Sequence, residues 1–389
     1  MTPVQHPYEI HSQKLLNGLL DEQTLENLSN YGIDSQKKFM ESPLRMLMGL
    51  GLSPQLIRNV KSQISEHPYT PEYDLSEVPF IGENTLSQLR AKGLSVEVIE
   101  LSSIEEISSS YDVPTDLARE IQEYIRTEMR AEDFLSALDI LHERQNRGTI
   151  TTGCEAIDGI TFISELGSGG IRTGETTEFF GSPRTGKTQF CLQLCITTQL
   201  PEELGGLGKK SLFIDTEGTF APSRIIQIAK DIKERYNWNK DVREILKDIH
   251  YAKVSNSDQQ KAIAKQLITQ MDSNVGLLVV DSISALFRSE YSSSDMIKRQ
   301  QSLNEHLNTL FRLATGKQIA VVVTNQVSSF PQQILGDSVR AVGGNIIGHW
   351  ANTRFELSSI GQSRSLKIFD SPALPEFHAN YKIVSGGIH

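Results

Sequence analysis

A glycine-rich segment containing one lysine has the residue types and spacing to bind phosphate groups. The segment reads Gly181-Ser-Pro-Arg-Thr-Gly-Lys-Thr188 and fits the pattern G-x-x-x-x-G-K-[ST] at every required position. Its glycines let the chain curl so that successive N–H groups face phosphate oxygens, and the positive end of the following helix adds to the attraction. Lys187 supplies a charge to the β- and γ-phosphates of a nucleoside triphosphate, and the Thr188 hydroxyl is a magnesium ligand. The residues expected to contact the nucleotide are Gly181, Ser182, Pro183, Arg184, Thr185, Gly186, Lys187, Thr188 and Gln189.

Two further apolar runs end in carboxylates that complete such a site. A magnesium–nucleotide site needs a buried carboxylate at a strand end, and the run Leu277-Leu-Val-Val-Asp281 predicts that Asp281 fills this role. Hydrolysis also needs a group that orients or activates water. The run Phe213-Ile-Asp-Thr-Glu217 offers two carboxylates, and the sequence alone leaves both open. If this strand adjoins the phosphate-loop strand, Glu217 is better placed than Asp215.

The residue pattern after position 151 predicts the elements that position these side chains. Short apolar runs alternate there with longer amphipathic stretches. Strands are predicted at 175–180, 211–214, 276–280 and 319–323, and helices at 188–198 and 222–236. This alternation is typical of an α/β domain whose mostly parallel sheet is covered on both faces. Ligands bind at the carboxyl ends of such strands, so the lysine loop and the carboxylates should meet at one edge.

The first 130 residues instead predict short helices separated by turns. They contain a weak internal repeat, because residues 28–64 align without gaps on residues 89–125 and pair Leu28 with Leu89. We interpret this as a duplicated helical unit, with chance agreement of two amphipathic helix sets as the alternative. The turn at 78–82 is typical of a helix-hairpin-helix unit, whose backbone N–H groups can bind phosphate. A plain helical bundle is the other interpretation.

Charge and cysteine content exclude several classes of protein. The net charge is −10, of which residues 1–130 carry −9 and residues 131–389 carry −1. The total charge argues against a protein that coats nucleic acid through a basic exterior, but the nearly neutral residues 131–389 leave room for a local anion site. The acidic amino-terminal third favours a protein contact or a regulatory role. Cys154, Cys191 and Cys195 have neither zinc nor disulfide spacing, and Cys191 and Cys195, one helical turn apart, should be buried. Without a long apolar run or a signal pattern, we expect an intracellular protein and no membrane contact.

Ordered motifs between residues 78 and 376 are similar to those of one family. They are Ile150-Thr-Thr-Gly153, Gly170-Ile-Arg-Thr-Gly174, the loop from Gly181 to Gln189, Ile214-Asp-Thr-Glu-Gly-Thr-Phe220, Arg299-Gln-Gln301, Thr324-Asn-Gln-Val327, Gly343-Gly-Asn-Ile-Ile347, His349 and Phe369-Asp-Ser-Pro-Ala-Leu-Pro-Glu376. The chain resembles the RecA-type DNA recombinases, in particular the archaeal RadA proteins and their eukaryotic relatives.

The resemblance implies an α/β fold in which a RecA-like P-loop NTPase core with a mostly parallel central sheet follows a small all-α helix-hairpin-helix domain. We expect four parts along the chain. Residues 1–70 form a helical extension that would hold the first helix-hairpin-helix repeat, and residues 71–130 form the helix-hairpin-helix domain. Residues 131–150 are a linker with a polymerisation hook, and residues 151–389 are the RecA-like ATPase core.

The same resemblance implies roles for the matching residues, with ATP and Mg²⁺ as cofactors. Lys187 and Gln326 would act with Glu217 in catalysis, and Thr188 and Asp281 would be the metal ligands.

Further positions match residues around the nucleotide in this family. Arg224 matches an arginine that lies against the adenine. Gln326 and His349 match residues that sense the γ-phosphate and link it to the DNA-binding loops. Asp370, Ser371 and Pro372 resemble the segment that caps ATP from the neighbouring subunit, so that polymerisation would complete the active site.

Assembly and DNA contacts are implied in the same way. Phe134 and Ala137 match the Phe-x-x-Ala hook by which one protomer docks onto the next. Segments 289–299 and 327–342 would be mobile loops that face DNA, and Arg299, Phe330 and Arg340 are the expected DNA contacts there.

The chain departs from the family pattern at both DNA segments. Ser294 and Asp295 stand where a Gly-Arg-Gly turn is common, and Phe330 stands where the archaeal pattern tends to have arginine. Loss of two cations should weaken DNA binding and its dependence on salt.

The predicted function is ATP-dependent homologous recombination and repair, by filaments that form on single-stranded DNA, search for homology in double-stranded DNA and exchange strands. Predicted partners are DNA, further copies of the chain in a filament or ring, and recombination mediator proteins; the location would be cytoplasmic in an archaeon and nuclear in a eukaryote. One alternative is a recombinase paralogue that binds ATP and assists filament assembly without exchanging strands. Another is a RecA-fold regulatory ATPase that acts on protein, and a hexameric helicase is the last.

Overall fold

The computed structural model describes residues 20, 22–31, 33, 39, 42, 47, 50, 52, 75–125, 136–328, 340–341, 345–361 and 363–389. Internal contacts group the chain into two compact units, one made of Met1–Pro79 with Glu132–Asn146 and the other of Phe80–Ala131 with Arg147–His389. The boundaries expected at residues 70, 130 and 150 stay predictions.

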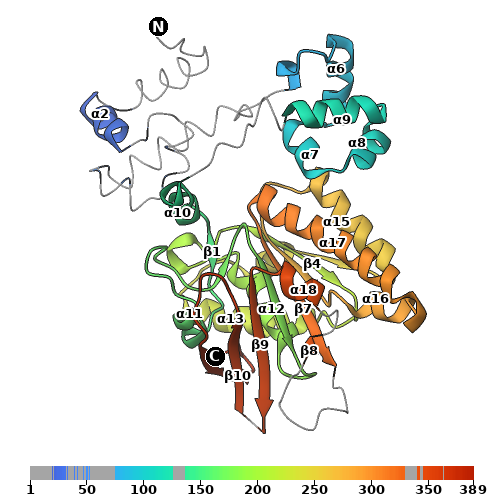
Figure 1. Cartoon of the computed structure of the whole chain (residues 1–389). Coiled ribbons are helices and arrows are strands. Elements are labelled where there is room, and N and C mark those ends of the chain that lie inside the picture. Colours follow the sequence, from blue (N-terminus) through green and yellow to red (C-terminus); the bar gives the residue numbers. More distant parts are fainter. Residues whose placement is uncertain are drawn as a thin grey trace. The chain divides into compact units, whose positions relative to one another are not determined.

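The second unit is built on one large sheet with the order β11-β10-β9-β3-β7-β6-β4-β5, and β8 pairs with β7. Its five central pairings are parallel, whereas β10 runs antiparallel to both of its neighbours. The strands are β3 (Thr176–Gly181), β4 (Lys210–Asp215), β5 (Ile249–Lys253), β6 (Val275–Asp281), β7 (Ala320–Ser328), β8 (Arg340–Ala341), β9 (Thr353–Ile360), β10 (Ser363–Asp370) and β11 (His378–Tyr381). Figure 1 shows β9 and β10 as two long neighbouring arrows. The α/β prediction is confirmed.

Helices cover both faces of this sheet. Their bounds are α11 (Glu155–Ile160), α12 (Lys187–Thr197), α13 (Pro222–Arg235), α14 (Val242–Lys247), α15 (Ser257–Gln270), α16 (Ala285–Glu290), α17 (Met296–Lys317) and α18 (Asn345–Trp350), with short 3₁₀ turns η3 (Glu202–Leu204) and η4 (Ser293–Asp295). Two small antiparallel pairs complete the unit, namely β1 (Thr149–Ile150) with β2 (Ile171–Arg172) and β12 (Ile383–Val384) with β13 (Gly387–Ile388).

The alternation of strand side chains divides the core into two apolar layers. Phe179, Val279 and Val322 pack with α12 and α13 on one face. Val280 and Val323 pack with α17 and α18 on the other. Because both faces are covered, every residue of β6 is buried, which explains its unbroken apolar run.

Four short helices precede the sheet in the same unit, namely α6 (Glu83–Ala91), α7 (Val96–Leu101), α8 (Ile104–Tyr111) and α9 (Thr115–Tyr124). The Ser103 side chain accepts from the N–H of Glu106, whose carboxylate accepts from the N–H of Ser103, so a capping box starts α8. Leu101 packs among the apolar residues of α15 and α17.

The structure supports the internal repeat. The N–H of Leu94 donates to the carbonyl of Leu89, and the N–H of Ile33 donates to the carbonyl of Leu28, at equivalent positions of the two copies. The same bond joins residues 113 and 108 in one copy and residues 52 and 47 in the other. Helix ends of this form are common, so these bonds agree with a duplicated unit, and the duplication itself stays a prediction.

The first unit contains α2 (Glu22–Asn30), the 3₁₀ turn η1 (Leu75–Glu77) and α10 (Ala137–Gln145). Its described residues share a small apolar cluster formed by Leu20, Leu28, Ile33, Phe39, Leu47 and Leu52. The three cysteines lie in the other unit and are free and buried, as predicted for Cys191 and Cys195. Among the described residues, no helix is long and apolar enough to cross a membrane.

Candidate nucleotide site

The phosphate loop connects β3 to α12, as the motif requires. Gly181 has a φ of +154°, and a Cβ placed there would stand 2.1 Å from the carbonyl oxygen of Leu357. Gly186 has a φ of +112° and directly precedes α12. Any larger side chain at position 181 would collide with the neighbouring strand, so glycine is required by space as well as by φ. The loop is therefore held in a curve at the amino end of a helix.

Lys187 folds back over this loop. Its Nζ donates to the carbonyl of Gly181 at 2.8 Å and to the carbonyl of Ser182 at 2.9 Å. Burial lowers the pKa of Lys187, while the charges of Asp281 and Glu217 act in the opposite direction. The ammonium group thus lies against the backbone of the loop that is predicted to bind phosphates.

Asp281 ends β6 next to the start of α12. Its Oδ2 accepts a hydrogen bond of 2.7 Å from the Thr188 hydroxyl, and its Oδ1 accepts from the Thr324 hydroxyl. Burial raises the pKa of Asp281, and the two hydroxyl donors oppose that change. The structure therefore brings together the two oxygen-bearing residues predicted to hold magnesium.

The two carboxylates after β4 have different surroundings. Asp215 Oδ1 accepts from the backbone N–H groups of residues 217, 218 and 219 at 3.0, 2.7 and 3.3 Å, and its Oδ2 accepts from that of residue 220 at 3.1 Å. The Tyr251 hydroxyl also donates to Oδ2, at 3.3 Å. Asp215 is completely buried and its oxygens are occupied in shaping the turn. Glu217 stands at the outer end of that turn, so geometry favours Glu217 for contact with water.

Glu217 is tied to the neighbouring strands by one carboxylate oxygen. Its Oε1 accepts from the Ser282 hydroxyl at 2.7 Å and from Gln326 Nε2 at 3.0 Å. Gln326 lies on β7 directly opposite Gly181 of β3. The structure therefore brings Glu217 and Gln326 together, and their catalytic roles stay predictions.

Arg224 lies at the amino end of α13 and faces the carboxyl-terminal hairpin. Its Nε donates to Gln189 Oε1 at 2.7 Å, and its NH2 nitrogen donates to the carbonyl of Val384 at 2.6 Å. The NH1 nitrogen donates to the carbonyl of Ser385. These bonds fix the plane of the guanidinium group beside the phosphate-loop residue Gln189; its contact with adenine stays a prediction.

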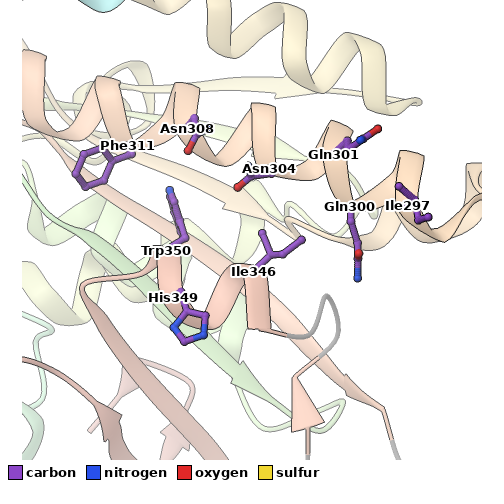
Figure 2. Close-up of a pocket in the computed structure, with 9 residues that line it drawn as sticks. All are labelled: Ile297, Gln300, Gln301, Asn304, Asn308, Phe311, Ile346, His349 and Trp350. Carbon is purple, nitrogen blue, oxygen red and sulfur yellow. The ribbon is translucent and has the colours of Figure 1, made fainter.

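His349 lies on α18, away from the hydrogen bonds of the phosphate loop described above. It lines a pocket of about 560 Å³ between α17 and α18, shown in Figure 2. The α17 side presents a row of amides, and Figure 2 shows Trp350 and Ile346 facing it from α18. The lining residues are Ile297, Gln300, Gln301, Asn304, Asn308, Phe311, Ile346, His349 and Trp350. A role for His349 at a γ-phosphate stays a prediction.

The predicted cap segment follows β10. Asp370 is the last residue of that strand and stands opposite Arg354 of β9. Ser371 Oγ lies 3.3 Å from the Thr353 hydroxyl, and Pro372 is exposed. The segment is thus anchored to β9 while its far side is open.

The DNA segments are described in part. Segment 289–299 comprises the end of α16, η4 and the start of α17, so Arg299 stands in the first turns of a helix and not in a loop. Residues such as Met296, Lys298 and Gln300 favour helix, which explains this difference. The backbone of Arg340 pairs with Ser328. Phe330 and the hook residue Phe134 lie outside the described residues, and Ala137 begins α10.

Comparison with known proteins agrees with this geometry. The family model named Rad51 matches residues 143–389. The chain belongs to the Rad51 family. It is similar to the "DNA repair and recombination protein RadA" of Aeropyrum pernix, with 38% identity over 319 residues that cover 81% of this chain and 96% of the relative.

The site of this Rad51-family chain suits a magnesium-bound triphosphate. A loop whose glycines leave no space for a Cβ, a lysine satisfied only by carbonyl oxygens, and paired hydroxyl and carboxylate oxygens provide the contacts that phosphate and Mg²⁺ prefer. Two contributors were missed from the sequence, namely Ser282 and Thr324. Each directly follows a buried strand run, and that position was the available signal.

Proposed function

We propose that this chain is an ATP-dependent recombination protein that polymerises on single-stranded DNA, searches for homology in duplex DNA and exchanges strands. The observation that carries the proposal is the bond between Gln326 and Glu217. Strand β7, which carries Gln326, continues toward the second predicted DNA segment, and Glu217 is the carboxylate placed for water. DNA bound at that segment would therefore change the rate of ATP hydrolysis through this bond.

The proposed mechanism assigns each step to residues of this chain. The loop N–H groups and Lys187 would hold the phosphates, and Thr188 and Asp281 would hold Mg²⁺, which would supply positive charge to neutralise the phosphates. Glu217 orients the attacking water, and Gln326 and Ser282 hold its carboxylate in place. ATP binding at a subunit interface capped by Asp370 would favour the DNA-binding state of the filament, and hydrolysis would release it.

Joint-molecule formation tests this proposal. The full chain is mixed with a single-stranded oligonucleotide, homologous duplex DNA, ATP and Mg²⁺, and Lys187→Ala serves as the matched control. We expect joint molecules with the unchanged protein and none with the variant. Folded protein that binds ATP but gives no product would contradict strand exchange.

One observation favours a second function, that of a paralogue that assists the filament without exchanging strands. Asp295 accepts from the Ser292 hydroxyl at 2.7 Å and lies 3.7 Å from Lys298 Nζ. The acidic residue thereby offsets a cation in the segment expected to contact DNA phosphates, which would weaken DNA binding. In that case, adding the protein to an active recombinase would increase joint molecules that this protein cannot form alone.

A further inference from the structure

A buried ion pair lies in the sheet beside the phosphate-loop strand. Glu178 of β3 is completely buried, and its Oε2 accepts from Arg354 Nε of β9 at 2.7 Å. The Arg354 side chain is only 11% exposed. Burying such a pair costs desolvation, and apolar residues of similar volume often stabilise a fold as well or better. Fold stability therefore gives little reason for this pair, and its contacts indicate another role.

The first contact leads to the catalytic side of the sheet. The second carboxylate oxygen of Glu178 accepts from Asn325 Nδ2 at 2.8 Å. Asn325 Oδ1 in turn accepts from the Ser284 hydroxyl at 2.8 Å and from the backbone N–H of Gln326 at 3.0 Å. Gln326 contacts Glu217. Two hydrogen bonds therefore link the buried pair to the backbone of the residue that touches the proposed water-activating group.

The other contacts are made by Arg354. They involve the neighbours of Asp370 and His349, two residues that are predicted to contact a nucleotide. The Phe369 ring lies 5.1 Å from the Arg354 guanidinium and precedes the cap residue Asp370. Gly348 of α18 also faces Arg354, because a Cβ at position 348 would stand 3.2 Å from its NH1 nitrogen. His349 is the next residue.

We propose that the Glu178–Arg354 pair is a positioning element that holds three nucleotide-facing segments, those of Gln326, His349 and Asp370, in one fixed arrangement. In a filament each protomer would contribute to two ATP sites, one through its phosphate loop and the other through its cap residue Asp370. The pair thereby couples these two sites. This inference rests on the proposed function for the roles of the three segments. The pair itself touches no nucleotide and acts through its neighbours.

The geometry is suited to such coupling. Glu178 and Arg354 stand directly opposite each other on adjacent parallel strands, and Phe180 packs against both Phe369 and Arg354. Phe180 immediately precedes the phosphate loop. A contiguous set of packed and hydrogen-bonded groups around a buried pair can transmit a shift from one segment to the others.

The test replaces the pair by apolar residues in the full chain, as Glu178→Val with Arg354→Met. The matched control is Lys240→Met, which removes another partly buried ion pair, that with Asp248. The double variant also removes the acceptor of the Asn325 Nδ2 bond, so its thermal unfolding midpoint should fall, but by no more than about 10 °C. We expect cooperative ATP hydrolysis in the unchanged protein and a Hill coefficient near one in the double variant. Stimulation by single-stranded DNA should fall about fivefold or more, whereas the control keeps both properties.

A stable double variant with unchanged cooperativity and unchanged DNA stimulation would overturn the proposal. If the double variant does not fold, Glu178→Gln replaces it, with the same expected and contradicting results. If the unchanged protein neither binds nor hydrolyses ATP, the proposed function fails, and amide hydrogen exchange then tests the positioning element alone. Exchange at residues 326, 348–349 and 369–370 should increase together in the pair variant; unchanged exchange at these residues would also overturn the inference.

Discussion

Gln326 Nε2 and Ser282 Oγ donate to the same oxygen of Glu217, at 3.0 and 2.7 Å. Two donors on Oε1 leave the orientation of the carboxylate defined and the other oxygen available for water. Gln326 belongs to β7 and Ser282 follows β6, so the two strands that flank this corner of the site fix the group between them.

Glu217→Gln should separate ATP binding from hydrolysis. The amide keeps the size of the side chain but cannot take a proton from water, so kcat should fall about 10²- to 10⁴-fold with little change in ATP affinity. Phosphate release and equilibrium binding of a fluorescent ATP analogue measure the two quantities. Glu202→Gln, at an exposed position in η3, should change neither. Full activity in Glu217→Gln would exclude Glu217 as the activating group.

Asp215→Asn should act mainly on stability. An amide would turn a nitrogen toward the donors of Phe220 and Tyr251 that now bond to Oδ2. Loss of these bonds should cost about 1–3 kcal/mol in the free energy of unfolding, measured by chemical denaturation. Asp241→Asn is the matched control, because Asp241 caps α14 and asparagine caps helices equally well. Equal stability of the two variants would contradict the structural role of Asp215.

Mg–ATP should stabilise the unchanged protein and not Lys187→Ala. A ligand at about 100 times its Kd adds about 2.7 kcal/mol to the stability of the folded state. Thermal unfolding with and without nucleotide measures the effect, and the variant also loses the two loop bonds of the ammonium group. A similar thermal shift in both proteins would place the nucleotide elsewhere.

His306→Phe should flatten the dependence of stability on pH. His306 is buried between Phe287 and Gln260, and burial lowers its pKa to about 3. Between that value and the ordinary 6.5, the unfolded chain binds more protons than the folded chain, so stability falls as the pH decreases through this window. Above pH 6.5 this contribution to the slope vanishes.

The slope removed by the substitution should approach about 1.4 kcal/mol per pH unit. Denaturation midpoints from pH 7.5 down to pH 4.5 measure it, and the two proteins should run parallel above pH 7. Identical slopes in the acidic range would show that His306 is not buried in the neutral form.

The sequence predicts the elements around the site within a few residues, because apolar runs mark buried strands. The largest error in the predicted length of an element is that of β7, which was expected at 319–323 and extends to Ser328. Thr324, Asn325 and Gln326 continue the strand, but a pattern based on hydrophobicity does not detect them because they are polar. They serve Asp281, Glu178 and Glu217 instead of the apolar core.

The sequence does not show which residues contact each other when they lie far apart along the chain. Glu178 and Arg354 stand far apart along the chain, and only the parallel pairing of β3 with β9 brings them opposite each other. A glutamate within a strand whose residues are all buried gave no sign in the sequence of the partner it needs. The choice between Asp215 and Glu217 likewise needed the turn itself, because the backbone N–H groups that occupy Asp215 have no signature in residue type.

Two consecutive amides of β7 point to opposite faces of the sheet: Asn325 toward Glu178, and Gln326 toward Glu217. Adding or deleting one residue before them would exchange their sides, because successive side chains of a strand alternate. Asn325 would then be on the same face as Glu217, where the longer side chain of Gln326 is needed to reach the carboxylate. Any engineered change of length, such as insertion of a reporter peptide, therefore has to leave residues 320–328 intact.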